Sequence, residues 1–168
     1  MILAIGGAGC NMVESIMREA SALWIREATY LFADTDQTRL AKLAKKGYQT
    51  ILLKDSEITD ENLKDVKKLY LLAGLGGNTS STYINEVAKT AKTAGINDVC
   101  AIVTTPFYFE GEGKITKAKE AIKNLDGIKT TVLHNDDLLE KYADINFATA
   151  FDYADMSVLK AIELEKIQ

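Results

Sequence analysis

Six of the 11 glycines in this sequence fall in two short loops, Gly6–Gly9 and Gly74–Gly77. Each loop follows an apolar run and precedes a helical pattern. Glycine lets a ligand approach the backbone closely, and the start of a helix offers unpaired N–H groups at the positive end of its dipole. Two such loops predict a phosphate chain that is held from two sides. The alternative is that each loop is only a tight turn between a strand and a helix.

The two loops do not match the common phosphate-binding motifs. A dinucleotide fingerprint needs a third glycine where this chain has Met12, and no strand is followed by the Gly-Lys-Ser/Thr of a Walker loop. The predicted phosphate site is therefore of a third kind. We find no pairing of a nucleophile with a base in the sequence, and we interpret the lone His134 as structural.

Composition narrows the class of protein. The 168 residues suffice for one domain with a full core, and a net charge of −4 without a basic patch argues against a nucleic-acid partner. No run is apolar for long enough to span a membrane, and the apolar start breaks into glycines, unlike a signal peptide. Cys10 and Cys100 lack metal-ligand spacing, so we interpret them as reduced structural thiols. We expect a cytoplasmic protein.

Strand-like and helix-like segments alternate along the chain. Strands are predicted at Ile2–Ile5, Thr29–Ala33, Tyr48–Leu53, Leu69–Ala73, Val99–Thr104 and Thr130–Leu133. Helices are predicted at Asn11–Trp24, Thr35–Lys46, Thr59–Lys67, Thr79–Ala94, Lys114–Asn124, Asp136–Lys141 and Ile145–Gln168. Apolar runs are nearly continuous in four of the strands, as in a parallel sheet that is buried on both faces. The alternation predicts a doubly wound, mainly parallel sheet, in which ligands bind at the carboxyl ends of the strands.

Six ordered blocks of the sequence resemble the FtsZ/tubulin superfamily, and FtsZ in particular. They are Ile5–Asn11, Asp34–Asp36, Ala73–Thr79, Val103–Gly111, His134–Leu139, and the paired positions Ala150–Phe151 and Ala154–Asp155. The block Val103–Gly111 is the most specific, because it is very similar to the family's Val-Thr-Lys-Pro-Phe-x-Phe-Glu-Gly. The resemblance implies a single three-layer, Rossmann-like nucleotide-binding domain that ends in a long helix. It covers essentially the whole chain, but only the first half of the family's protein.

The resemblance also implies a role for individual residues around GTP or GDP. The α- and β-phosphates would be held by the backbone of Gly6, Gly7, Ala8, Gly9, Cys10 and Asn11. The terminal phosphates would be held by Gly76, Gly77, Asn78, Thr79 and Ser80. Glu110 and Lys114 would face the ribose and the phosphates, and Phe151 would pack on the base. Asn135 and Asp155 would read the guanine edge, whose N1 and N2 are both donors that suit a carboxylate. From the residues alone, Asp155 could instead be solvated, Asn135 could cap a helix, and Glu110 could belong to a turn.

The chain departs from the family pattern at the phosphate end. Asn78, Ser80 and Thr82 replace glycines, so their side chains could obstruct the site. Lys114 replaces an arginine and loses its bidentate fork. Asp34 replaces an asparagine and adds a negative charge near the site, which a metal ion would offset. The segment Lys54–Glu57 is acidic where the family has a glycine-rich loop. Whether Mg²⁺ accompanies the nucleotide stays open.

Two functions remain in competition at this point. In the family, hydrolysis uses an acidic loop that follows the central helix, and this sequence carries no copy of it. The leading hypothesis is a domain that binds GTP or GDP with weak or no hydrolysis and is linked to cell division or cytoskeletal filaments. The alternative is a nucleotide-free module that contacts FtsZ-like filament subunits or another copy of itself. The final helix sets an apolar stripe against a polar back, which favours a standalone domain over a fragment; the stripe comprises Phe147, Phe151, Ala154, Val158 and Ile162.

Overall fold

The protein folds around a single parallel sheet. The computed structural model describes residues 1–142 and 146–167, so the predicted helix ends Ile145 and Gln168 lie outside the described residues. Within these residues the strands are β1 (Ile2–Ile5), β2 (Tyr30–Asp34), β3 (Gln49–Leu52), β4 (Lys68–Gly74), β5 (Asp98–Thr105) and β6 (Lys129–His134). All pairings are parallel, in the order β3-β2-β1-β4-β5-β6. Each predicted strand is confirmed to within one residue at either end.

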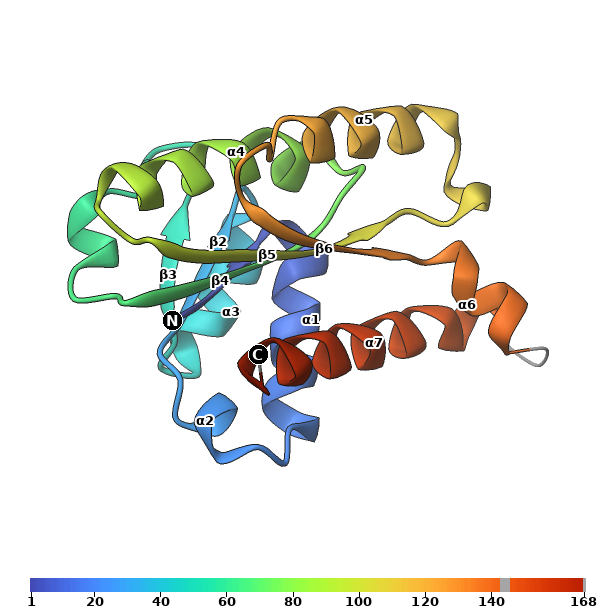
Figure 1. Cartoon of the computed structure of the whole chain (residues 1–168), viewed down its shortest axis with the longest axis horizontal. Coiled ribbons are helices and arrows are strands. Elements are labelled where there is room, and N and C mark those ends of the chain that lie inside the picture. The colour runs from blue at the N-terminus through green and yellow to red at the C-terminus, as the bar shows by residue number, and fades with distance from the viewer. Residues whose placement is uncertain (143–145, 168) are drawn as a thin grey trace.

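Helices cover both faces of the sheet, which confirms the doubly wound, three-layer fold. They are α1 (Gly6–Glu19), α2 (Leu23–Arg26), α3 (Gln37–Lys45), α4 (Asn78–Thr93), α5 (Glu112–Lys123), α6 (Asp136–Lys141) and α7 (Phe147–Ile167). Figure 1 shows α4 and α5 on one face, with α1, α3 and α7 on the other. The side chains of β1 alternate between the two layers, because Leu3 and Ile5 pack with α4 while Ile2 and Ala4 pack with α1 and α7. In the described part of the chain, no helix is long and apolar enough to cross a membrane.

Two predicted helices are wrong in extent. The helix predicted at Asn11–Trp24 begins five residues earlier, because Gly6 adopts a φ of +72° and lets α1 start directly after β1. It ends at Glu19, and α2 follows as a separate turn. The helix predicted at Thr59–Lys67 is only a 3₁₀ turn at Asp60–Leu63. There, Thr59 and Asn62 close a capping box, and the backbone of Asp65 turns left-handed at a φ of +60°.

The predicted final helix is confirmed over the residues that the structure describes. Only some residues of its predicted apolar stripe are buried. Ala154, Val158 and Ile162 are buried against the body of the domain, whereas Phe151 is 50% exposed. The side chain of Phe147 lies outside the described residues. Met156 is exposed on the outer face of α7. The second half of the helix therefore joins the core beside α1, and its first half packs Ala150 and Ala154 in a smaller cluster with Phe107 and Leu138.

The strand order places a topological switch between β1 and β4. From β1 the chain moves outward to β2 and β3, and it then returns to the other side of β1 to form β4. In open parallel sheets, ligands bind at the carboxyl ends of the strands at such a point. Because β1 ends at Ile5 and β4 ends at Gly74, both glycine-rich loops lie at this point.

Two glycines allow α1 to lie directly on β4. A Cβ on Gly9 would lie 2.5 Å from the carbonyl oxygen of Leu72, and a Cβ on Gly74 would lie 2.5 Å from the Cβ of Ala8. Both distances are far below van der Waals contact, so neither position can accept a side chain without a shift of the backbone. The absence of these two side chains fixes the distance between the helix and the strand.

We expect Gly9→Ala to lower the free energy of unfolding by about 1–3 kcal/mol, since the added methyl group overpacks the contact between α1 and β4. Urea unfolding followed by circular dichroism measures the change. The matched control is Gly113→Ala in the exposed first turn of α5, where a Cβ would meet nothing within 4 Å. This control should be neutral or stabilising by up to about 1 kcal/mol. Equal effects of the two substitutions would contradict the close packing.

Candidate nucleotide-binding cleft

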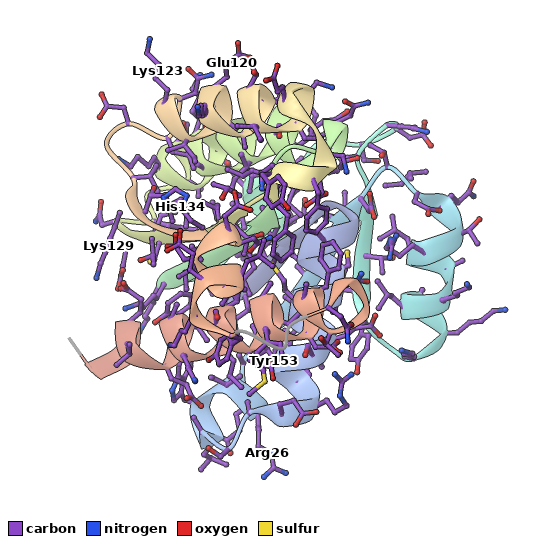
Figure 2. All side chains as sticks on the ribbon, turned by 90° about the vertical axis from the view of Figure 1, so that its right-hand side faces the viewer. Arg26, Glu120, Lys123, Lys129, His134 and Tyr153 are labelled. Carbon is purple, nitrogen blue, oxygen red and sulfur yellow. The ribbon has the colours of Figure 1, made fainter. Side chains whose placement is uncertain are left out.

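A cavity of about 270 Å³ opens at the carboxyl ends of the central strands. This is slightly below the ~300–1,000 Å³ range of most small-molecule sites. Figure 2 faces this end of the sheet, with His134 marking the end of β6. The residues that line the cavity come from both glycine loops, the end of β5, the first turn of α5 and the turn before it, the residue after β6, and the first half of α7. Those among the predicted site residues are Gly7, Ala8, Asn11, Gly77, Asn78, Thr79, Ser80, Glu110, Lys114, Asn135, Phe151 and Asp155.

Five predicted site residues do not line the cavity. Gly6 makes the turn into α1, and Gly9 packs on the backbone of β4. Cys10 is buried in the core, and burial raises the pKa of its thiol to about 12, so it stays protonated and inert. Gly76 has a φ of +99°, and a Cβ there would lie 3.0 Å from the carbonyl oxygen of Lys114. Asp34 is buried behind the first loop. These five positions shape or support the loops.

The second loop leaves the cavity open despite its substitutions. Thr82 is exposed and is not among the lining residues, so it does not obstruct the space. The Ser80 hydroxyl points toward Gly6, because a Cβ on Gly6 would lie 2.8 Å from it. The hydroxyl groups of Thr79 and Thr35 lie 2.7 Å apart and tie the start of α4 to the end of β2. The Gly76 amide donates to the Ser81 hydroxyl at 2.9 Å.

The other end of the cavity is aromatic and polar. Phe151 packs edge-on against Phe107, with ring centroids 5.4 Å apart. Asn135 is 5% exposed, and its side chain makes no cap bond to α6, so its amide is not used as a helix cap. Glu110 accepts from the Phe107 amide and from Lys114 Nζ, each at 2.9 Å. This carboxylate therefore closes a turn and also borders the cavity.

Comparison with known proteins decides the family of this fold. No protein-family model matches the sequence. The chain is 36% identical to the cell division protein FtsZ of Aquifex aeolicus, with 96% of the chain and 49% of the relative aligned. An FtsZ dimer structure from M. jannaschii matches at a TM-score of 0.75 and 22% identity, over 96% of this chain and 52% of that one. The chain is an FtsZ-like domain. It spans about half the length of the curated relatives it matches.

The FtsZ-like fold also extends to a second branch of structures. CetZ2 from Haloferax volcanii, described as a GTPγS-bound protofilament, matches at a TM-score of 0.72 and 16% identity. The match covers 97% of this chain and 56% of the CetZ2 chain. At this identity the match shows a shared fold.

Sequence reasoning missed several residues around the cleft of the FtsZ-like domain. Seven further residues line it, namely Met12, Gly74, Leu75, Thr104, Thr105, Pro106 and Ala154. Thr104, Thr105 and Pro106 belong to the block that resembles FtsZ most, so that block was the available signal. His134 lies beside the cleft, with Nδ1 3.3 Å from the Thr105 hydroxyl. Among the described residues, no three His, Cys, Asp or Glu side chains gather as a metal site.

Arg39 offsets the unexpected charge of Asp34. Its Nε lies 3.0 Å from Asp34 Oδ2, and both atoms are buried without an aligned hydrogen bond, so the contact is ionic. Arg39 Nη1 also donates to Asn11 Oδ1 at 3.2 Å. Its Nη2 would lie 2.9 Å from a Cβ on Gly7, so the guanidinium lies directly behind the first loop. A side chain of the protein thus takes the role that the sequence suggested for a metal ion.

Asp155 has a carboxylate whose pKa is shifted from its ordinary value, and this residue lines the cleft. Burial, followed by the charge of Asp152, raises its pKa to about 6, and Arg18 opposes the shift. An ionised carboxylate in this position is costly unless a ligand supplies donors to it. Asp155 is therefore poised to accept hydrogen bonds from a ligand at neutral pH.

We expect Arg39→Ala to lower the free energy of unfolding by about 1–3 kcal/mol, because Asp34 then stays buried without a compensating charge. Adding Asp34→Asn to Arg39→Ala should recover at least half of the loss. The control is Lys42→Ala on the exposed face of α3, which should change stability by less than about 0.5 kcal/mol. Chemical denaturation of the four proteins measures these differences. The pair has no stabilising role if the double variant is the least stable.

We expect Asp155→Asn to stabilise the fold at pH 7.5 and to lose this advantage in acid. The folded pKa of about 6 lies above the ordinary aspartate value of 3.8, so the ionised carboxylate destabilises the folded state above pH 6. Two pKa units correspond to about 3 kcal/mol, which partial exposure reduces to about 1–2 kcal/mol. The difference should shrink between pH 6 and pH 4 and vanish below it. Unfolding curves at pH 7.5, 5 and 4 measure it, with Asp126→Asn as the control, because this exposed carboxylate is not among the groups that shift the Asp155 pKa. A gain that is independent of pH would contradict the assignment.

Proposed function

We propose that this FtsZ-like domain binds a guanine nucleotide, GTP or GDP, in the cleft, with weak or no hydrolysis by this chain alone. The observation that carries the proposal is the shape of one cavity. Segments more than 140 residues apart in sequence, from Gly7 to Asp155, meet around it. One end offers backbone amides, and the other offers an aromatic ring and a carboxylate.

The phosphate end relies on the starts of α1 and α4. Neither helix has a side chain that caps its first turn or an acidic residue in that turn. The amides of both first turns are therefore available to an anion, and both helix dipoles favour negative charge there. Gly77 leaves room for the phosphates to approach, since it lines the cleft and a Cβ there would meet nothing within 4 Å.

The base end supports guanine over adenine. Guanine presents two donors, N1 and N2, to a single carboxylate, whereas adenine presents an acceptor at N1. Asp155 and Asn135 line the same end of the cleft as the half-exposed ring of Phe151. A bound guanine would stack on Phe151 and satisfy the carboxylate of Asp155, which lowers its pKa again.

The positions and hydrogen bonds of the two carboxylates that line the cleft support the proposal of weak hydrolysis. In the described cleft, Glu110 is engaged by Lys114 and by the Phe107 amide, and Asp155 lies at the base end. Neither is placed to orient water at a terminal phosphate. We further propose that assembly involves FtsZ-like subunits or a second copy, since relatives of this fold are described as a dimer and as a protofilament.

We expect GTP and GDP to bind at submillimolar concentration and at least about 10-fold more tightly than ATP at pH 7.5. Asp155→Asn should lower guanine-nucleotide affinity by about 10–100-fold and remove the preference over ATP. Titration of fluorescent nucleotides, with competition by unlabelled ones, measures the affinities. Asp126→Asn is the control, since this exposed carboxylate does not line the cleft and is not among the groups that shift the Asp155 pKa. The proposal fails if the three nucleotides bind equally or not at all.

A further inference from the structure

A lysine on α5 reaches the phosphate end of the cleft from outside it. The first turn of α5 lies against the second loop, since a Cβ on Gly76 would lie only 3.0 Å from the Lys114 carbonyl oxygen. One turn further along, Lys117 Nζ donates to Asn78 Oδ1 at 2.6 Å. Asn78 lines the cleft and is the first residue of α4. Lys117 is exposed, so its ammonium group can move without disturbing the core.

The charges around the phosphate end distinguish Lys117 from its neighbours. Lys114 is paired with Glu110 at 2.9 Å, and Arg39 is paired with Asp34 at 3.0 Å. The described ion pairs include none for Lys117, whose recorded partner is a neutral amide oxygen. Near the second loop, therefore, Lys117 contributes a positive charge that is not paired with a carboxylate among the described residues.

We propose that Lys117 neutralises the terminal phosphate of the bound nucleotide and thereby makes affinity depend on the number of phosphates. This inference rests on the proposed nucleotide-binding function. The Asn78 oxygen holds the ammonium group at the start of α4, where the terminal phosphate would meet the first amides of that helix. A phosphate oxygen then joins or replaces the Asn78 oxygen as the acceptor, and the resulting bond is charge-assisted on both sides.

The test compares GTP, GDP and GMP on the wild-type chain, Lys117→Met and Lys117→Arg by isothermal titration at pH 7.5. We expect Lys117→Met to weaken GTP by about 10-fold, GDP by about 3-fold and GMP by less than 2-fold, as for a lost charge-assisted bond. Lys117→Arg should stay within about 3-fold of wild type for all three. The wild-type preference for GTP should also fall as salt rises, because exposed charges are screened.

The matched control is Lys123→Met at the end of the same helix. Figure 2 shows Lys123 pointing away from the sheet into solvent, and it lies outside the cleft lining. This variant should bind all three nucleotides as the wild type does. An equal loss for all three nucleotides with Lys117→Met would show that Lys117 only positions Asn78, and no loss would exclude it from the site. Either result overturns this inference alone. A wild-type chain that binds no nucleotide overturns the proposed function as well.

Discussion

The close contact between α1 and β4 determines where the two glycine-rich loops of this domain lie relative to each other. The contact exists because Gly9 and Gly74 have no side chains, so the helix backbone lies directly on the strand. Since α1 begins directly after β1, and α4 begins a few residues after β4, the same contact brings two helix starts to one point at the edge of the sheet. The cleft is thus a consequence of backbone packing before any polar side chain is considered.

Charge is distributed around this cleft in neutral pairs. Arg39 offsets Asp34 behind the first loop, and Lys114 offsets Glu110 at the rim. Because these pairs nearly cancel, the field at the phosphate end comes from the helix starts and from Lys117, which forms no ion pair among the described residues. The opposite end holds the carboxylate of Asp155, which repels phosphates. In the proposed function, this polarity orients the nucleotide in one direction, with its base toward α7.

The sequence predicts the sheet well because four of its six strands, β1, β2, β4 and β5, are nearly continuous buried runs, as is typical of a parallel sheet covered on both faces. It predicts the start of α1 poorly, since the residues from Gly6 to Cys10 have the low helix propensity of a loop, and only the packing on β4 makes them helical. Most of the proposed site could be located by resemblance, because its residues lie in contiguous blocks. Arg39 and Lys117 could not, since they reach the loops as side chains from helices whose packing is visible only in three dimensions.

Arg39 and Lys117 also change the expected effect of two substitutions that depart from the FtsZ pattern, Asp34 and Asn78. Read along the sequence, Asp34 adds a repulsive charge and Asn78 adds bulk where glycine is expected. In the folded chain, Asp34 lies 3.0 Å from Arg39, and Asn78 accepts a hydrogen bond from Lys117. Each substitution is therefore accompanied by a cation from a helix, α3 for Asp34 and α5 for Asn78, and the net charge of each group is no more negative than that of an uncharged loop. The effect of a loop substitution on anion binding therefore cannot be judged from the sequence position alone. It also depends on the charged side chain that lies next to the substituted residue in the folded protein.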